Sequence, residues 1–150
     1  MLDSHPPTMS LKVGRPRCID RNKLRPHVPT ARLPFVQILH IATASDWADA
    51  VAASEYRVST LGVTIDEEGF IHASTPEQLQ PTASRFYAHV TDPLVVLVLR
   101  TEVLEDAGVP VRFEDAGTGE LFPHLYAALP VALVDEVRSA AFDDAGTLVF

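Results

Sequence analysis

One run of six apolar residues, LVVLVL at positions 94–99, constrains the fold of this chain more than any other stretch. Successive side chains of a strand point to opposite faces of its sheet, so a strand that is apolar at every position must be covered on both faces. The run therefore predicts a central strand with packed layers on either side. It is also the longest candidate for a membrane span, and it falls far short of the roughly 18 apolar residues that a spanning helix needs.

Caps and apolar spacing predict the elements around this strand. A first helix is capped by Thr43 or Ser45 and runs to about residue 54, and a second covers residues 75–90 with a kink or restart at Pro81. The remaining predictions are strands at residues 35–41, 109–114, 132–138 and 147–150, a helical turn at 101–107, and a loop with one short strand at 55–68. This order predicts an α+β fold in which two main helices pack on a mixed or antiparallel β-sheet.

Residues 1–34 differ in composition from the rest of the chain. They contain six of the 12 prolines and no apolar periodicity, which predicts a disordered, basic, Pro-rich extension before a single α+β domain at residues 35–150. Seven Lys or Arg against two Asp give residues 1–33 a net charge of +5, which leaves −13 for the remainder of a chain of net charge −8. An alternative is that this stretch is a basic arm for nucleic acid. The acidic remainder disfavours a nucleic-acid or anionic-membrane surface.

Residue usage excludes several kinds of chemistry from residues 35–150. The one cysteine, Cys18, and both lysines, Lys12 and Lys23, lie before residue 35. A cysteine nucleophile, a thiolate metal site and a Schiff-base lysine are therefore not expected in the domain. The N-terminus lacks the apolar core of a secretory signal, so we expect a cytoplasmic location.

The stretch EGFIHAST at residues 68–75 is the first candidate for a functional site. Gly69 can adopt a positive φ, the next residues suit a buried strand, and Thr75 followed by Pro76 is typical of a helix start. Because side chains on a strand alternate, His72 and Ser74 should share one face. An imidazole and a hydroxyl are thus expected side by side near a helix N-terminus, where anionic ligands are often held.

His40, Glu114 and His124 also lie beside predicted strand ends or turns. Histidine titrates near neutral pH, so His40, His72 and His124 are candidates for acid–base or ligand-binding roles. Each has a structural alternative: His40 can be a core ring bonded to the backbone, and the LFPHLY stretch around His124 can be a turn packed into the core.

Sequence motifs of several common kinds of active site do not occur. A metal site would have to combine the three histidines with Glu114, but no HxH, HxxxH or HExxH spacing supports it, so no metal is expected. The GxSxG elbow of a Ser-His-acid hydrolase using Ser74 is missing, and so are the glycine-rich phosphate loops GxGxxG and GxxxxGK[ST].

Several motifs in a fixed order resemble a bacterial family, domain of unknown function 952. They are LHIAT, Trp47, GFIHAST with a glutamine three residues on, and LFPHLYxxLP, and together they span about residues 38–138. That family resembles the ADP-ribosyltransferase superfamily in fold, which implies a split β-sheet and a cleft that binds NAD. By this resemblance His40 matches the first position that lines the cleft, His72 with Ser74 the second, and Glu114 or His124 the third.

The resemblance implies a nucleotide-binding transferase of ADP-ribosyltransferase type, acting on NAD or ADP-ribose. His72, Glu114 and His124 are the expected catalytic residues, and His40, His72, Ser74 and Tyr126 are expected to bind the cofactor. Nicotinamide is a cationic leaving group, so the reaction needs positioning and a negative charge near the sugar, which Glu114 could supply. The alternative is a non-catalytic small-ligand or protein-binding module that uses the same cleft.

Overall fold

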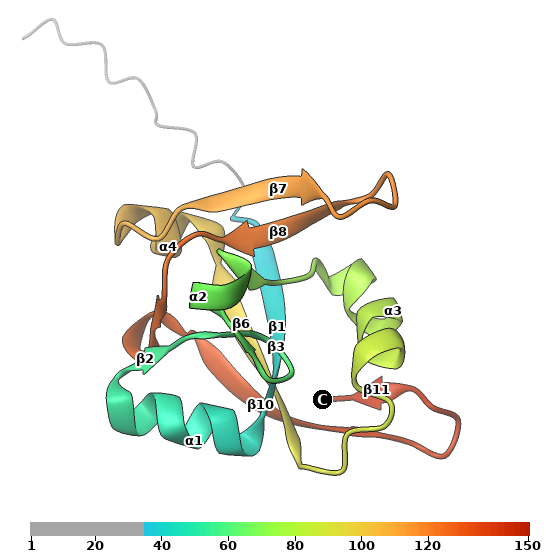
Figure 1. The fold of residues 1–150 in the computed structure, drawn as a ribbon. Coiled ribbons are helices and arrows are strands. Elements are labelled where there is room, and N and C mark those ends of the chain that lie inside the picture. The colour runs from blue at the N-terminus through green and yellow to red at the C-terminus, as the bar shows by residue number, and fades with distance from the viewer. Residues whose placement is uncertain (1–34) are drawn as a thin grey trace, which may run out of the picture. The chain divides into compact units, whose positions relative to one another are not determined.

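The computed structural model describes residues 35–150, so the predicted N-terminal extension and its basic arm lie outside the described residues (Figure 1). The helices are α1 (Ala44–Ala53), α2 (Ile65–Glu68), α3 (Pro76–Phe86) and α4 (Thr101–Asp106), with a 3-10 turn at Val131–Leu133. The longer strands are β1 (Gln37–Thr43), β6 (Leu94–Arg100), β7 (Val111–Asp115), β8 (Leu121–Leu125) and β10 (Glu136–Phe142). The short strands are β2 (Glu55–Tyr56), β3 (Val58–Thr60), β4 (Val63–Thr64), β5 (Ile71–His72), β9 (Leu129–Pro130) and β11 (Leu148–Val149).

The apolar run at 94–99 forms most of β6, which lies inside the largest sheet. That sheet has the order β1-β6-β10-β11, and every pair of strands in it is antiparallel. All six residues of the run are buried, so the predicted central strand is confirmed. The α+β class is confirmed as well, and the strand pairs of the described residues are antiparallel rather than mixed.

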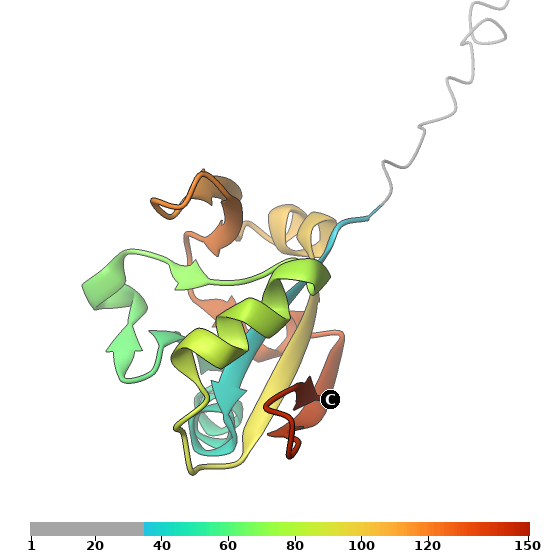
Figure 2. The same cartoon turned by 90° about the vertical axis from the view of Figure 1, so that its right-hand side faces the viewer.

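Two apolar layers cover the two faces of β6, one with α1 and the other with α3. Val95, Leu97 and Leu99 belong to the core layer that contains Ala50 of α1. The alternate residues Leu94, Val96 and Val98 pack in a second layer, with Leu79 and Ala83 of α3. Figure 2 shows α3 lying across the β1–β6 face, with α1 behind it. The alternation of strand side chains thus explains why the run has no polar position.

A second sheet, β5-β8-β7, diverges from the first. The two sheets meet at a single antiparallel bridge, in which the backbones of Leu39 and Ser74 exchange two hydrogen bonds of 2.8 Å. This bridge fixes EGFIHAST against the outer edge of β1, because β1 is the edge strand of its sheet. Residues at the edge of β1, on the second sheet and on α3 therefore line one common cavity.

The LFPHLY stretch forms the middle strand of this second sheet, β8, and not a turn. Proline is disfavoured inside sheets because it has no N–H to donate. The carbonyl of Pro123 accepts from the N–H of Ala73 at 2.9 Å, on the side of β5. Since the N–H and C=O of one strand residue point the same way, the missing donor also faces that side, and the pairing with β7 loses nothing.

Three other predictions need correction. Residues 55–68 form three short strands and the helical turn α2, because their pairing partners include Leu129 and Pro130 far along the chain. The last long strand begins at Glu136, after a 3-10 turn where residues 132 and 133 were expected to be extended. Helix α3 continues through Pro81, which removes one backbone hydrogen bond, while a capping box of Thr75 and Gln78 holds the first turn. The same helix ends at Phe86, before Val90.

None of the helices in residues 35–150 is both long and apolar enough to cross a membrane.

The turn that opens EGFIHAST provides a simple stability test. Gly69 has φ 93°, as predicted, and a Cβ there would find no atom within 4 Å. Replacing Gly69 with Ala should therefore cost only the backbone strain of a left-handed residue, about 1–2 kcal/mol. Urea denaturation would measure this loss, and an unchanged midpoint would contradict the positive φ at this position.

Candidate functional site

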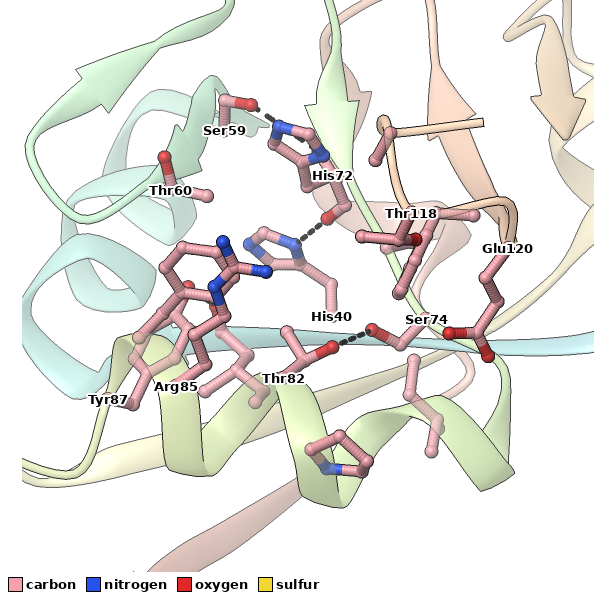
Figure 3. Close-up of a pocket in the computed structure, with 17 residues that line it drawn as sticks. His40, Ser59, Thr60, His72, Ser74, Thr82, Arg85, Tyr87, Thr118 and Glu120 are labelled. Carbon is pink, nitrogen blue, oxygen red and sulfur yellow. Dashed lines mark hydrogen bonds between the residues drawn. The ribbon is translucent and has the colours of Figure 1, made fainter. Parts of the chain in front are cut away.

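A cavity of about 370 Å³ lies beside the open edge of β1 (Figure 3). Its walls come from β1, β3, EGFIHAST, α3 and the loop between β7 and β8. Leu39, Ile41, Pro81, Phe86 and Phe122 give it apolar walls. The polar lining consists of His40, Ser59, Thr60, His72, Ser74, Thr82, Arg85, Tyr87, Thr118 and Glu120. The volume and this mixture of groups are typical of small-molecule sites.

His40 lies in the wall of the cavity with both ring nitrogens engaged. Nδ1 is 2.5 Å from the backbone oxygen of His72, and Nε2 is 2.9 Å from the hydroxyl of Tyr56. A carbonyl can only accept, so Nδ1 carries the proton, and Nε2 accepts from the Tyr56 hydroxyl. Burial lowers the pKa of His40 to about 4, although the hydrogen bond to the backbone of His72 acts in the opposite direction. The ring is therefore neutral at physiological pH. These contacts favour the structural interpretation of His40, which ties β1 to β5.

Ser74 and Thr82 present hydroxyl groups on the α3 side of the cavity. The Ser74 hydroxyl donates to Oγ1 of Thr82 at 3.3 Å (Figure 3). Their positions are held by the start of α3, where the side-chain oxygen of Gln78 accepts from the N–H of Thr75 and its amide donates to the carbonyl of Leu121. The buried Gln78 thus locks the start of α3 to the start of β8.

Arg85 brings the one positive side chain among the described residues that line the cavity. Within residues 35–150, Arg57, Arg100 and Arg138 form ion pairs with carboxylates, while Arg85 and Arg112 do not. The Arg85 guanidinium lies 5.1 Å from the centre of the Phe86 ring. Because no carboxylate neutralises it, Arg85 can accept an anionic group of a ligand.

Glu120 places a carboxylate on the side of the cavity opposite Arg85 (Figure 3). It belongs to the turn at residues 116–120, between β7 and β8. Three backbone N–H groups of this turn, from Gly117, Thr118 and Gly119, donate to one oxygen of Asp115 at 2.8–2.9 Å. The turn therefore has a defined shape that holds Glu120 and Thr118 at the cavity.

His72 lies at the boundary of the cavity and is half-buried. Its Nε2 is 3.4 Å from Oε1 of Glu68, and its backbone N–H donates to Ser59 at 3.4 Å. Burial is the main reason that the pKa of His72 is lowered, and the nearby His124 lowers it further, while Glu68 acts in the opposite direction. A neutral His72 near physiological pH can accept a proton.

Behind His72, three of the predicted residues form a hydrogen-bonded cluster. Oε2 of Glu114 is 3.0 Å from Nδ1 of His124, and it accepts from the Tyr126 hydroxyl at 2.5 Å. The bond from Tyr126 and then that from His124 lower the pKa of Glu114, so this carboxylate is charged. The guanidinium of Arg112 lies 4.6 Å from the centre of the Tyr126 ring. We call Glu114, His124 and Tyr126 the His124 cluster.

The sequence-predicted residues thus occupy two adjoining places. His40, His72 and Ser74 line the cavity, whereas Glu114, His124 and Tyr126 do not. The rings of His72 and His124 connect the two, with centroids 4.9 Å apart, because these residues pair directly across β5 and β8. No group of three or more His, Cys, Asp or Glu is arranged to hold a metal ion in the part of the chain that the structure describes.

Sequence reasoning did not identify several polar residues of the cavity. They are Ser59, Thr60, Thr82, Arg85, Tyr87, Thr118 and Glu120. Helical spacing could have placed Thr82 and Arg85 on one face, since they are three residues apart in a predicted helix. Ser59 and Glu120 carry no such local signal, because long-range pairing decides where their segments lie.

The family model described as "Protein of unknown function (DUF952)" matches residues 41–137, which is more than half of the chain. The chain belongs to this family. A crystal structure of protein CC0527 from Caulobacter crescentus is similar, with 30% identity and a TM-score of 0.65, and the match covers 75% of this chain and 93% of that one. The solution NMR structure of CC0527 gives 30% identity and a TM-score of 0.61, with 74% and 90% covered.

No curated protein matches the chain. The DUF952 resemblance expected from the sequence is confirmed by the family match, whereas the likeness to ADP-ribosyltransferases finds no support in these relatives. Both the family description and the names of the similar structures leave the activity open, so function has to be argued from the cavity itself.

Proposed function

We propose that this DUF952 protein binds NAD or ADP-ribose in the cavity beside β1 and acts as a transferase of ADP-ribosyltransferase type. One observation carries the proposal: an unpaired arginine, several hydroxyls and a titratable imidazole converge on one cavity with apolar walls. Arg85 would contact the pyrophosphate, because guanidinium groups bind phosphate oxygens through paired N–H donors.

The hydroxyl groups of Ser74 and Thr82 suit the ribose part of such a ligand. Each hydroxyl can both donate and accept, as ribose hydroxyls do. Their mutual distance of 3.3 Å is long for a hydroxyl pair, so either can exchange its partner for a ligand at little cost. Phe86 and Phe122 line the same cavity and offer apolar area to a nicotinamide or adenine ring.

The roles of the acidic residues follow from where they lie. A positive charge develops on the ribose as the bond to nicotinamide breaks, and a nearby carboxylate stabilises it. Glu114 was expected to supply this charge, but its carboxylate is held by His124 and Tyr126 outside the cavity lining. In the proposed reaction Glu120, which lines the cavity, takes this role.

Ligand binding is the first test. Titration calorimetry with NAD and with ADP-ribose should give measurable heat, and Arg85→Gln should weaken binding of either ligand about 10- to 100-fold, the range of one charged hydrogen-bonded contact. Arg138→Gln is the matched control, because Arg138 pairs with Glu136 on β10 and does not line the cavity. Absence of heat with both ligands at millimolar concentration would sink the proposal, as would equal affinities of the two variants.

A non-catalytic binding module is the second candidate, and the contacts of His40 favour it. Both ring nitrogens of His40 form hydrogen bonds within the protein. His40 therefore cannot exchange a proton with a ligand unless one of these hydrogen bonds breaks. Nicotinamide release from NAD distinguishes the two functions. A transferase should release nicotinamide, and the rate should fall with His72→Ala; a binding module should bind ADP-ribose and release none.

A further inference from the structure

The His124 cluster contains a buried imidazole nitrogen that has no hydrogen-bond partner among the described residues. His124 is 4% exposed, and its Nε2 has no hydrogen-bond partner among residues 35–150. A buried polar atom normally finds a partner, because leaving it unpaired costs roughly 1–3 kcal/mol.

The contacts of the other nitrogen determine the tautomer of His124. Nδ1 is 3.0 Å from Oε2 of Glu114, and the charged carboxylate can only accept, so Nδ1 carries the proton. The unpartnered Nε2 therefore holds a lone pair. Tyr126 donates to the same carboxylate oxygen, which fixes the carboxylate in place. A carboxylate that orients a histidine in this way stabilises the imidazolium formed when Nε2 takes a proton.

Phe70 covers this ring. The two rings are stacked, with centroids 4.1 Å apart and an angle of 18° between their planes, and Phe70 is itself only partly buried. Phe70 follows Gly69, whose left-handed conformation ends α2. His72, two positions after Phe70, lines the cavity. Phe122, two positions before His124 on β8, lines it as well. His124 thus lies directly behind the cavity wall, under one aromatic side chain.

We infer that His124 is the general base of the proposed reaction, that Glu114 is its positioning residue, and that Phe70 is a cover that moves aside to admit the acceptor. This inference rests on the proposed function. It adds an acceptor site at Nε2 of His124, next to the dinucleotide in the cavity.

The proposed step conserves atoms and charge. The acceptor is water or an alcohol, whose oxygen attacks the anomeric carbon of the nicotinamide ribose. The carbon–nitrogen bond to nicotinamide breaks, and its electron pair stays with the nicotinamide, which leaves as a neutral molecule. The acceptor proton passes to Nε2 of His124, and the resulting imidazolium faces the Glu114 carboxylate.

Several charged or titratable groups surround His124. Glu114 and Arg112 face it from β7, Tyr126 lies just beyond the end of β8, and His72 faces it from β5 with Glu68 behind. Burial lowers the pKa of His72, and the adjacent His124 lowers it further, so protonation of His72 changes the charge facing His124. Rates should therefore be compared as full pH profiles and not at one pH.

The tautomer of His124 can be tested without any ligand. Two-dimensional NMR of the ¹⁵N-labelled protein, correlating ring nitrogens with ring protons, should show the Nδ1–H form of His124 at neutral pH. The Nε2–H form would overturn the inference, because Nε2 would then have no lone pair to accept a proton. This outcome leaves the proposed dinucleotide site untouched, so the two hypotheses fail separately.

The cover and the base require variants. Phe70→Ala, with Phe70→Leu as a milder change in case Ala does not fold, should speed the reaction of His124 with diethyl pyrocarbonate by exposing Nε2. His124→Gln should lower nicotinamide release about 100-fold or more, the usual contribution of a general base, and leave ADP-ribose affinity unchanged. Glu114→Gln should shift the pH profile of nicotinamide release. The pH profile of Glu114→Asp should lie closer to that of the wild type. Unchanged modification in both Phe70 variants, or an unchanged rate in His124→Gln, would refute the assignment.

Discussion

Lowering the pH from 7 to 4 should destabilise the wild-type protein by about 3 kcal/mol more than a His40→Gln variant, since each unit of pKa shift corresponds to about 1.4 kcal/mol. The pKa of His40 falls from 6.5 to about 4 on folding, chiefly because burial disfavours the charged ring. Between these two values the unfolded chain binds a proton that the folded protein does not. The contribution of the neutral His40 to the free energy of unfolding is therefore complete above pH 6.5. It decreases as the pH falls below 6.5, and the loss is nearly complete at about pH 4.

Urea denaturation at pH 7, 5.5 and 4 would measure this difference. His40→Gln will be less stable than the wild type at pH 7, since it disrupts the bonds to His72 and Tyr56, so the pH-dependent part is the informative quantity. His89→Gln serves as the control, because His89 is exposed near the end of α3. An equal pH dependence in wild type and His40→Gln would show that His40 does not stay neutral in the folded protein.

Leu97→Ala should have the second large effect and reduce the free energy of unfolding by about 2–5 kcal/mol. Leu97 is fully buried in the central strand, in the core layer that contains Ala50 and Tyr56. The cost combines the lost burial of the side chain with the cavity that remains, and this cavity cannot close easily because β6 is held by strands on both sides.

Val137→Ala is the matched control for Leu97→Ala. Val137 pairs directly with Leu97 across β10 and β6, but it is 40% exposed. It should cost about 1 kcal/mol or less, as partly exposed positions usually do. Denaturant midpoints with unchanged slopes would support a loss of stability in both cases. Similar losses for the two variants would contradict the burial of Leu97 in the core layer on its face of β6.

Several parts of the fold could be predicted because their signals are local. The run at 94–99 is apolar at every position, and only a strand covered on both faces accommodates it. Gly69 and Thr75 mark the turn and the helix start by their own backbone preferences. The alternation of a strand likewise placed His72 and Ser74 on one face, and both line the cavity.

Other parts depended on distant partners. The short strand β2 exists because it pairs with β9. Pro123 is tolerated in a middle strand because its backbone nitrogen faces the side of β5 and not the side of β7. Glu114 illustrates the same limit within the site. As a polar residue on a strand it was a candidate for the cleft, but the direction of its carboxylate depends on His124 of β8 and on Tyr126 just beyond that strand.

The sequence by itself determined the class of the fold, the central strand, the helix starts and the choice of histidines worth attention, because these follow from the properties of neighbouring residues. The tertiary structure alone decided which of those residues meet. The Leu39–Ser74 bridge joins the two sheets, Arg85 and Glu120 line one cavity, and His124 lies behind its wall under Phe70. Such meetings depend on strand pairings between distant segments, which no local pattern specifies.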